Sequence, residues 1–340
     1  MEVGPSFFEM QRLISGFSVT IAISAVANLG IADYLSEGPQ TSADLARLTG
    51  VDEQVLGRVL RYLASEGVFK EHDGDAYALT ERSGWLRSDV PGSLRSRAIF
   101  AGSSLNWASW GYLLETVRTG RSGVQVAFGE TLFDHLRSHA DAAATFNKFM
   151  ADQTAASVEA LVRAYSFAGV RELVDVGGGR GALVAGVLQA YPELRGILFD
   201  TPEVVTTAHP LLDRAGVADR CQVIGGDFFE ELPGGADLYA LKFILHDWPD
   251  AECIRILQNC RRAMASGGRV LIVEHCIPEG GGPDFSKFMD MNMLVLSPGG
   301  RERSENDFAQ LVAAAGLELQ GSVATIIGLW ALTCASPHSP

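Results

Sequence analysis

The first hundred residues alternate helical and strand-like patterns of apolar positions. Within 41–63, a cap at Asp52 and the i, i+4 pair Leu56 and Leu60 belong to a pattern that predicts two short helices. Segments 68–71 and 76–79 flank an Asp-Gly turn and predict a β-hairpin. Helix, turn, helix and hairpin in this order predict a winged-helix module.

From residue 171 onward, short apolar runs alternate with helical patterns, which predicts a mostly parallel sheet flanked by helices. The last two runs have too short a connection for a helical crossover, so we expect them to pair antiparallel. The seven predicted strands are 172–176, 196–200, 221–225, 237–245, 269–277, 317–322 and 325–334. The expected fold class is α/β, a Rossmann-like seven-stranded sheet with an antiparallel C-terminal hairpin, preceded by an all-α/winged-helix domain.

Charge decides between the partners that a winged helix can have. The chain carries 27 Lys+Arg against 41 Asp+Glu, a net charge of −14, which argues against nucleic acid and anionic membranes as partners. We therefore expect 1–100 to be a dimerisation domain, 101–165 a helical linker that contributes to a substrate pocket, and 166–340 a cofactor-binding domain.

Residues 13–32 carry no charge and raise the question of a membrane span or a secretory signal. Glu2 and Glu9 precede them, which is the wrong charge for a signal, and Ser, Thr and Asn dilute the apolar run. We expect a buried interface helix. The five cysteines are odd in number and form no C-x-x-C pair, so we expect no disulfide framework, no zinc cluster and a cytoplasmic location.

A glycine-rich loop joins the first strand of the predicted sheet to a helix. Gly177, Gly179 and Ala182 fit the G-x-G-x-x-G/A spacing, which lets a cofactor approach the backbone closely. This spacing alone admits a nicotinamide or an adenosyl cofactor. The next two strands end near Asp200, which can bind ribose hydroxyls, and near Asp227-Phe228, which can bind the adenine amine and ring. Together they predict an adenosine site.

Five motifs in a fixed order carry a resemblance to a known family. They are VDVGGG at 174–179, FDTP at 199–202, GGDFF at 225–229, LKFILHDW at 241–248 and PGGRER at 298–303. With them the sequence resembles the plant-type and bacterial natural-product O-methyltransferases, the family of the caffeate and hydroxyindole enzymes. The resemblance implies S-adenosyl-L-methionine as cofactor and a homodimer, with cofactor contacts from Thr154, Gly177, Asp200, Asp227, Phe228 and Lys242.

His246, after the fourth predicted strand, is the candidate general base. A phenol with a pKa near 10 is mostly protonated at neutral pH, whereas histidine, with an unperturbed pKa of about 6.5, can accept its proton. A carboxylate that fixes the imidazole tautomer improves such a base. The family places acids beside its catalytic histidine at the positions of Glu274 and Glu302, so both are assigned as orienting groups. Asp247 is interpreted as a helix cap.

The acceptor side is predicted from residue chemistry. Adaptable methionines and flat aromatic rings suit a planar ring, although each of them also fits an ordinary apolar core. Asp290 matches an acid in relatives and is expected to orient an acceptor hydroxyl. The candidate acceptor residues are Phe149, Met150, Met289, Asp290, Asn292 and Met293.

The leading hypothesis is an S-adenosylmethionine-dependent O-methyltransferase that acts on a phenolic or polyketide-like molecule in secondary metabolism, without a metal. The alternative is a relative that uses the same cofactor for N-methylation, decarboxylation or hydroxylation. A nicotinamide dehydrogenase leaves Asp227-Phe228 and His246 unexplained, and a DNA-binding regulator conflicts with the acidic N-terminal module.

Overall fold

The structure is a computed structural model that describes residues 4–337, and it divides into two compact units. The first unit comprises residues 1–108 and 136–153, and the second comprises 109–135 and 154–340. The domain limits predicted at residues 100 and 165 stay a proposal.

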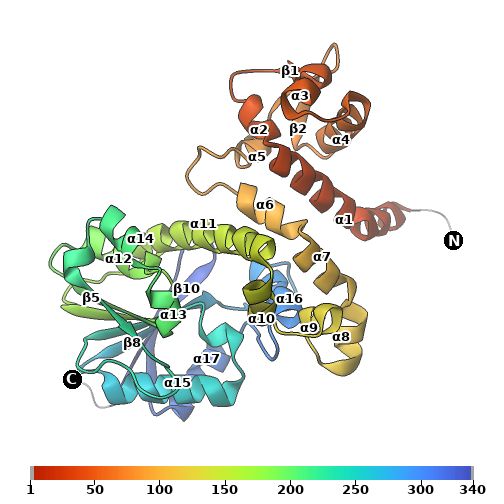
Figure 1. Ribbon diagram of the computed structural model, residues 1–340. Helices are drawn as coiled ribbons and strands as arrows, with labels where there is room; N and C mark the ends of the chain where they lie inside the picture. The colour runs from red at the N-terminus through yellow and green to blue at the C-terminus, as the bar shows by residue number, and fades with distance from the viewer. Residues whose placement is uncertain (1–3, 338–340) are drawn as a thin grey trace. The chain divides into compact units, whose positions relative to one another are not determined.

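The first unit contains the predicted winged-helix module (Figure 1). The side chains of Thr41 and Asp52 cap two helices by accepting backbone N–H bonds, and the three-stranded antiparallel sheet has the order β1-β3-β2. The core includes the fully buried Leu45, Leu60 and Tyr77. The module's elements are β1 (Gln40–Thr41), α3 (Ser42–Thr49), α4 (Glu53–Ser65), β2 (Phe69–His72) and β3 (Ala76–Leu79).

Helix α1 (Pro5–Leu29) holds most of the uncharged stretch and leaves much of its apolar surface uncovered. Leu13 is 75% exposed and Ile14 69% exposed, so this helix is not buried within its own chain, and its burial in an interface stays a prediction. By length and composition α1 is also apolar enough to cross a membrane. The large apolar side chains exposed on it are Phe7, Phe8, Met10, Leu13, Ile14 and Phe17.

Short helices join these elements to the rest of the chain. A longer one, α11 (Ala140–Ala164), has its first half in the first unit and its second half in the second. The remaining helices before the large sheet are α2 (Ile31–Tyr34), α5 (Glu81–Gly84), α6 (Arg95–Ala101), α7 (Ser104–Gly111), α8 (Leu113–Thr119), α9 (Gly123–Phe128) and α10 (Leu132–Ser138).

The second unit is built on a seven-stranded sheet in the order β6-β5-β4-β7-β8-β10-β9. The first five strands of this order are parallel, whereas β10 runs antiparallel to both β8 and β9, which confirms the predicted C-terminal hairpin. The strands are β4 (Glu172–Val176), β5 (Arg195–Asp200), β6 (Cys221–Gly225), β7 (Leu238–Lys242), β8 (Arg269–His275), β9 (Glu318–Ala324) and β10 (Leu329–Ala335).

Helices cover both faces of this sheet and bury a separate apolar cluster on each (Figure 1). One cluster packs the C-terminal half of α11 with α12 (Ala182–Ala190) and α14 (His209–Arg214). The other packs α15 (Asp250–Ala263) and α17 (Glu305–Ala314). The remaining helical elements of this unit are α13 (Pro202–Val205), η1 (Ala218–Arg220), η2 (Leu245–Asp247) and α16 (Phe285–Leu296).

Three strands have limits that differ from the sequence prediction. The predicted strand 237–245 ends early, because β7 stops at Lys242 and Phe243 has a left-handed backbone with φ +57°. The final turn lies at 325–328, so β9 and β10 are each shifted toward the C-terminus relative to 317–322 and 325–334.

Candidate active site

His246 lies in the short 3₁₀ turn η2 that follows β7, not in the strand itself. Glu274, on the neighbouring strand β8, explains why the strand ends there. Its Oε1 accepts backbone N–H bonds from Ile244 (3.0 Å), Leu245 (2.9 Å) and His246 (3.4 Å). A fully buried carboxylate thus takes the donors of three successive residues and shapes the turn around them.

The same two acids that the sequence singles out converge on one nitrogen of His246. Its Nδ1 lies 3.1 Å from Glu302 Oε1 and 3.5 Å from Glu274 Oε2. On the other side of the ring, Nε2 lies 3.9 Å from Asp247 Oδ2. Asp247 Oδ1 in turn accepts a bond from the Ser297 hydroxyl. His246, Glu274 and Glu302 form a buried cluster. Because both acids face Nδ1, Nε2 is the ring nitrogen that remains for a substrate.

Electrostatics keep a proton on this cluster. Burial lowers the pKa of His246, but Glu274, Asp247 and Glu302 outweigh burial and raise the pKa to about 10. Burial raises the pKa of Glu274 to about 7, against the opposing pull of His246. The imidazole of the free site therefore holds its proton more strongly than the unperturbed pKa of about 6.5 would give.

The three groups also meet a geometric criterion for a cation site. A ring nitrogen of His246 and one carboxylate oxygen each from Glu274 and Glu302 lie within 4.8 Å of one another. The same spacing serves an imidazolium shared between two carboxylates. The absence of a metal from the reaction stays a prediction.

The glycine loop after β4 leaves no space for side chains at two positions. A Cβ on Gly177, whose φ is +66°, would lie 2.5 Å from Cδ1 of Ile244. A Cβ on Gly178 would lie 2.5 Å from Cγ of Asp175. Asp175 is buried and accepts a bond from the backbone N–H of Val184 at the start of α12.

The two acids predicted to bind the nucleoside lie at strand ends and already accept backbone bonds. Asp200 Oδ2 accepts from Gly179 N–H (2.8 Å), and its Oδ1 accepts from Thr201 N–H (2.7 Å). Asp227 is exposed, and its Oδ1 accepts from Phe229 N–H (2.8 Å). A carboxylate has about four lone-pair positions, so both acids retain acceptors for a ligand.

Phe228 lies beside the glycine loop, and Lys242 lies at the end of β7, just before the turn that holds His246. Phe228 Cε1 would lie 3.6 Å from a Cβ on Gly177. The Lys242 ammonium donates to Thr154 Oγ1 (3.4 Å) and lies 4.1 Å from the centre of the Phe243 ring. Burial lowers the pKa of Lys242 to about 8, while Asp175 and Glu274 oppose the change. The amine thus keeps most of its charge at neutral pH.

The predicted acceptor residues fall into both units. Met289 and Met293 are buried on α16, where Asp290 and Asn292 are half-buried. Asp290 Oδ1 accepts from the backbone N–H of Glu302 (3.0 Å), so this acid supports the Glu302 loop. The remaining two, Phe149 and Met150, belong to the first unit, where Phe149 stacks on Phe100 with ring centres 4.9 Å apart.

Sequence reasoning missed two residues that hold the site. The Phe243 ring stacks on His246 with ring centres 5.4 Å apart, and no sequence pattern marks its left-handed backbone. Arg303 is buried and binds Asp250, as does Arg301, so both arginines pair with Asp250 and not with Glu302. The PGGRER motif contains Arg303, but nothing in the sequence marks it as a buried residue.

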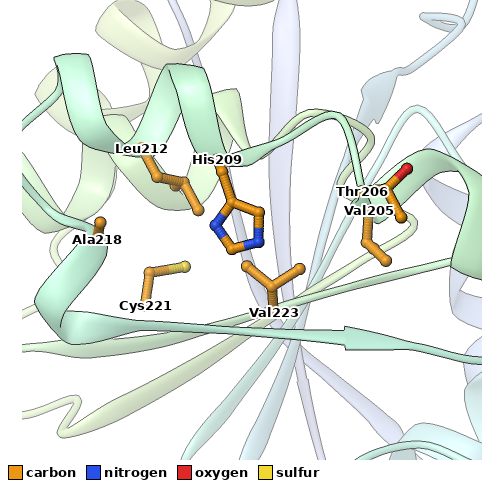
Figure 2. A pocket seen from close by; sticks show the side chains of 7 residues that line it. All are labelled: Val205, Thr206, His209, Leu212, Ala218, Cys221 and Val223. Carbon is orange, nitrogen blue, oxygen red and sulfur yellow. The ribbon is translucent and has the colours of Figure 1, made fainter.

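Two hollows in the second unit lie away from these residues. Figure 2 shows one of about 320 Å³ beside β6, where burial raises the pKa of the Cys221 thiol to about 11. The other, of about 680 Å³, runs between α11, α12 and α14. Apart from Ala182 of the glycine-loop motif, which lines the second hollow, neither contains a predicted site residue. The first is lined by Val205, Thr206, His209, Leu212, Ala218, Cys221 and Val223.

Comparisons with known proteins assign the chain to a family. Residues 110–318 match the O-methyltransferase domain and residues 11–89 match the O-methyltransferase dimerisation domain. A phenazine O-methyltransferase, PhzM, from Lysobacter antibioticus is 42% identical over 318 residues, which cover 94% of this chain and 93% of that protein. An 8-amino-8-demethylriboflavin N,N-dimethyltransferase from Streptomyces davaonensis is 36% identical over 89% of this chain and 88% of its own.

A solved structure adds ligands to the comparison. The O-methyltransferase NcsB1 from neocarzinostatin biosynthesis, in complex with S-adenosylmethionine and 2-hydroxy-5-methyl naphthoic acid, superposes with a TM-score of 0.76. It is 31% identical and the match covers 93% of this chain and 95% of that one. The chain belongs to the O-methyltransferase family. It is a methyltransferase and its cofactor is S-adenosylmethionine.

The fit of the glycine loop to this cofactor can be tested at Gly177. We expect Gly177→Ala to weaken S-adenosylmethionine binding at least about tenfold, because its Cβ would displace Ile244 and strain the left-handed backbone. Calorimetric titration measures the affinity. Gly169→Ala is the matched control, since Gly169 also has a left-handed φ (+82°) but has no atom within 4 Å of its Cβ position. Equal losses in both variants would contradict the prediction.

Proposed function

We propose that this protein methylates a hydroxyl group on an aromatic small molecule, phenolic or polyketide-like, in the synthesis of a secondary metabolite. The observation that carries the proposal is the buried cluster in which two carboxylates hold Nδ1 of His246. A relative that acts on nitrogen makes N-methylation the second candidate. An aromatic amine, however, attacks through its lone pair without a prior loss of a proton, so it has less use for such a base.

For the cofactor, we propose the contacts that the sequence motifs imply. Asp200 accepts hydrogen bonds from the ribose hydroxyls, while Asp227 and Phe228 hold the adenine. Gly177 allows the close backbone approach. Lys242 and Thr154, which already share a hydrogen bond, supply a positive charge and a hydroxyl for the carboxylate of the methionyl group.

In the proposed reaction, the bound cofactor supplies an electrophilic methyl group on a sulfonium. His246 accepts the hydroxyl proton of the acceptor on Nε2, and Glu302 and Glu274 stabilise the imidazolium through Nδ1. The acceptor oxygen forms the new C–O bond as the C–S bond breaks. Met289 and Met293 provide adaptable walls for the aromatic ring, with Phe149 and Met150 as further candidates, and Asn292 and Asp290 provide polar contacts.

We also propose that a second copy of the chain covers the apolar face of α1 in a homodimer. The matched dimerisation domain begins within this helix, and its exposed side chains are large and apolar. An interface core of this kind excludes charged residues. A reducing cytoplasm is the proposed location, because all five cysteines are buried free thiols.

Loss of the base should stop the reaction without loss of the cofactor. We expect His246→Ala to lower turnover about 10²–10⁴-fold, the usual range for a general base, and to leave S-adenosylmethionine affinity nearly unchanged. Labelled cofactor, a panel of phenols and matched anilines, and mass spectrometry of the products measure both rate and acceptor class. His209→Ala, at the hollow in Figure 2, is the control. Wild-type turnover in His246→Ala, or methyl transfer to anilines alone, would refute the proposal.

The pH dependence of kcat/KM reports the protonation of this cluster. Because the pKa of His246 is raised to about 10 and a phenol has a similar pKa, the reactive pair must lose one proton as pH rises. We expect log kcat/KM to climb with a slope near one from about pH 7.5, above the Glu274 pKa of about 7, to about pH 9. Glu302→Gln removes a charge that raises the His246 pKa, so its plateau should begin at lower pH. A flat wild-type profile would contradict this assignment.

Charged residues on α1 should dissociate the dimer. We expect the double variant Leu13→Glu/Ile14→Glu to run as one 36.4 kDa chain in light scattering, because two carboxylates would be buried in an apolar interface. Gln11→Glu introduces a charge on the same helix and is the control. A double variant that stays dimeric, or a monomeric wild type that co-sediments with phospholipid vesicles, would overturn the interface.

A further inference from the structure

Arg303 is a buried charged residue that the proposed reaction leaves unused. Its side chain is 1% exposed, although arginine is rarely buried without partners. Its guanidinium donates to the backbone carbonyls of Leu245 (Nη1, 2.8 Å) and Trp248 (Nη2, 2.8 Å), and both Nε and Nη2 donate to Asp250 Oδ1. Leu245 immediately precedes His246 in the chain, and Trp248 follows it by two residues.

The neighbours of Arg303 in the chain bind the same turn. The backbone N–H of Arg301 donates to the carbonyl of His246 (2.9 Å), and the Glu302 side chain contacts His246 Nδ1. Gly300 permits this approach, because a Cβ there would lie 2.9 Å from the His246 carbonyl oxygen. Three successive residues therefore bind the turn: Arg301 through its backbone amide, Glu302 through its carboxylate and Arg303 through its guanidinium.

We propose that Arg303 is a positioning residue, which fixes the backbone on both sides of His246 so that the imidazole keeps its alignment with Glu302. A planar guanidinium can hold two carbonyls and a carboxylate at once, whereas an ammonium lacks the fork that this requires. The inference rests on the proposed role of His246. It assigns to Arg303 an effect on the rate of the chemical step, with little effect on binding.

Arg303→Lys tests this role, because it keeps the charge and removes the fork. We expect kcat to fall about 10–100-fold, as for a misplaced catalytic group, with the KM for the acceptor and the S-adenosylmethionine affinity within about threefold of wild type. Arg301→Lys is the matched control, since the Arg301 side chain also binds Asp250 but its contact with the turn is through the backbone. Added guanidinium, and not urea, should restore part of the activity of Arg303→Ala.

A double-mutant cycle separates this inference from the proposed function. If Arg303 acts through His246, Arg303→Lys should have no further effect on kcat in a His246→Ala background. Wild-type turnover in His246→Ala would instead defeat the proposed function itself. A lowered melting temperature with unchanged kcat in Arg303→Lys, or an undiminished effect in the His246→Ala background, would overturn the positioning role.

Discussion

The carboxylate of Glu274 is the constraint on which the rest of the site depends. One of its oxygens accepts the backbone N–H groups of three successive residues, and the other faces the imidazole of His246. A buried carboxylate with no compensating donors would be strongly destabilising. The bonds that make its burial tolerable are the same bonds that end β7 and turn the chain, so the shape of the turn and the charge beside the base have one origin.

The Glu302 loop completes the site from the opposite side of the turn. Asp290 on α16 accepts the Glu302 backbone N–H, and Gly300 lets the loop reach the His246 carbonyl. The helix that carries the proposed acceptor residues is therefore bonded to the loop that orients the base. A shift of α16 would move Glu302 relative to His246, so the proposed acceptor residues on α16 are coupled to the proposed base through this bond.

The sheet was predictable from the sequence, since apolar runs and strand-end motifs are local signals, and the structure brings His246 together with the two acids that the motifs singled out. The family, the cofactor and the antiparallel hairpin followed from them and are confirmed. The end of β7 was not predictable, because the turn after the left-handed Phe243 is bonded to Glu274, which lies about thirty residues later. Arg303 and the raised pKa of His246 depend on the same long-range packing.

Proton affinity also bears on the choice of acceptor. The acids beside His246 raise the pKa of its imidazolium toward that of a phenol, which would bring proton transfer from a phenol to the proposed base closer to balance. A carboxylic acid would already be ionised, and an aromatic amine loses its proton only after the methyl group has been transferred. The negative charge of the carboxylates around His246 disfavours a further negative charge nearby, on the acceptor oxygen. The positive charge of the sulfonium would offset this repulsion. In the proposed mechanism, the cluster would therefore assist the deprotonation of a phenol once the cofactor is bound.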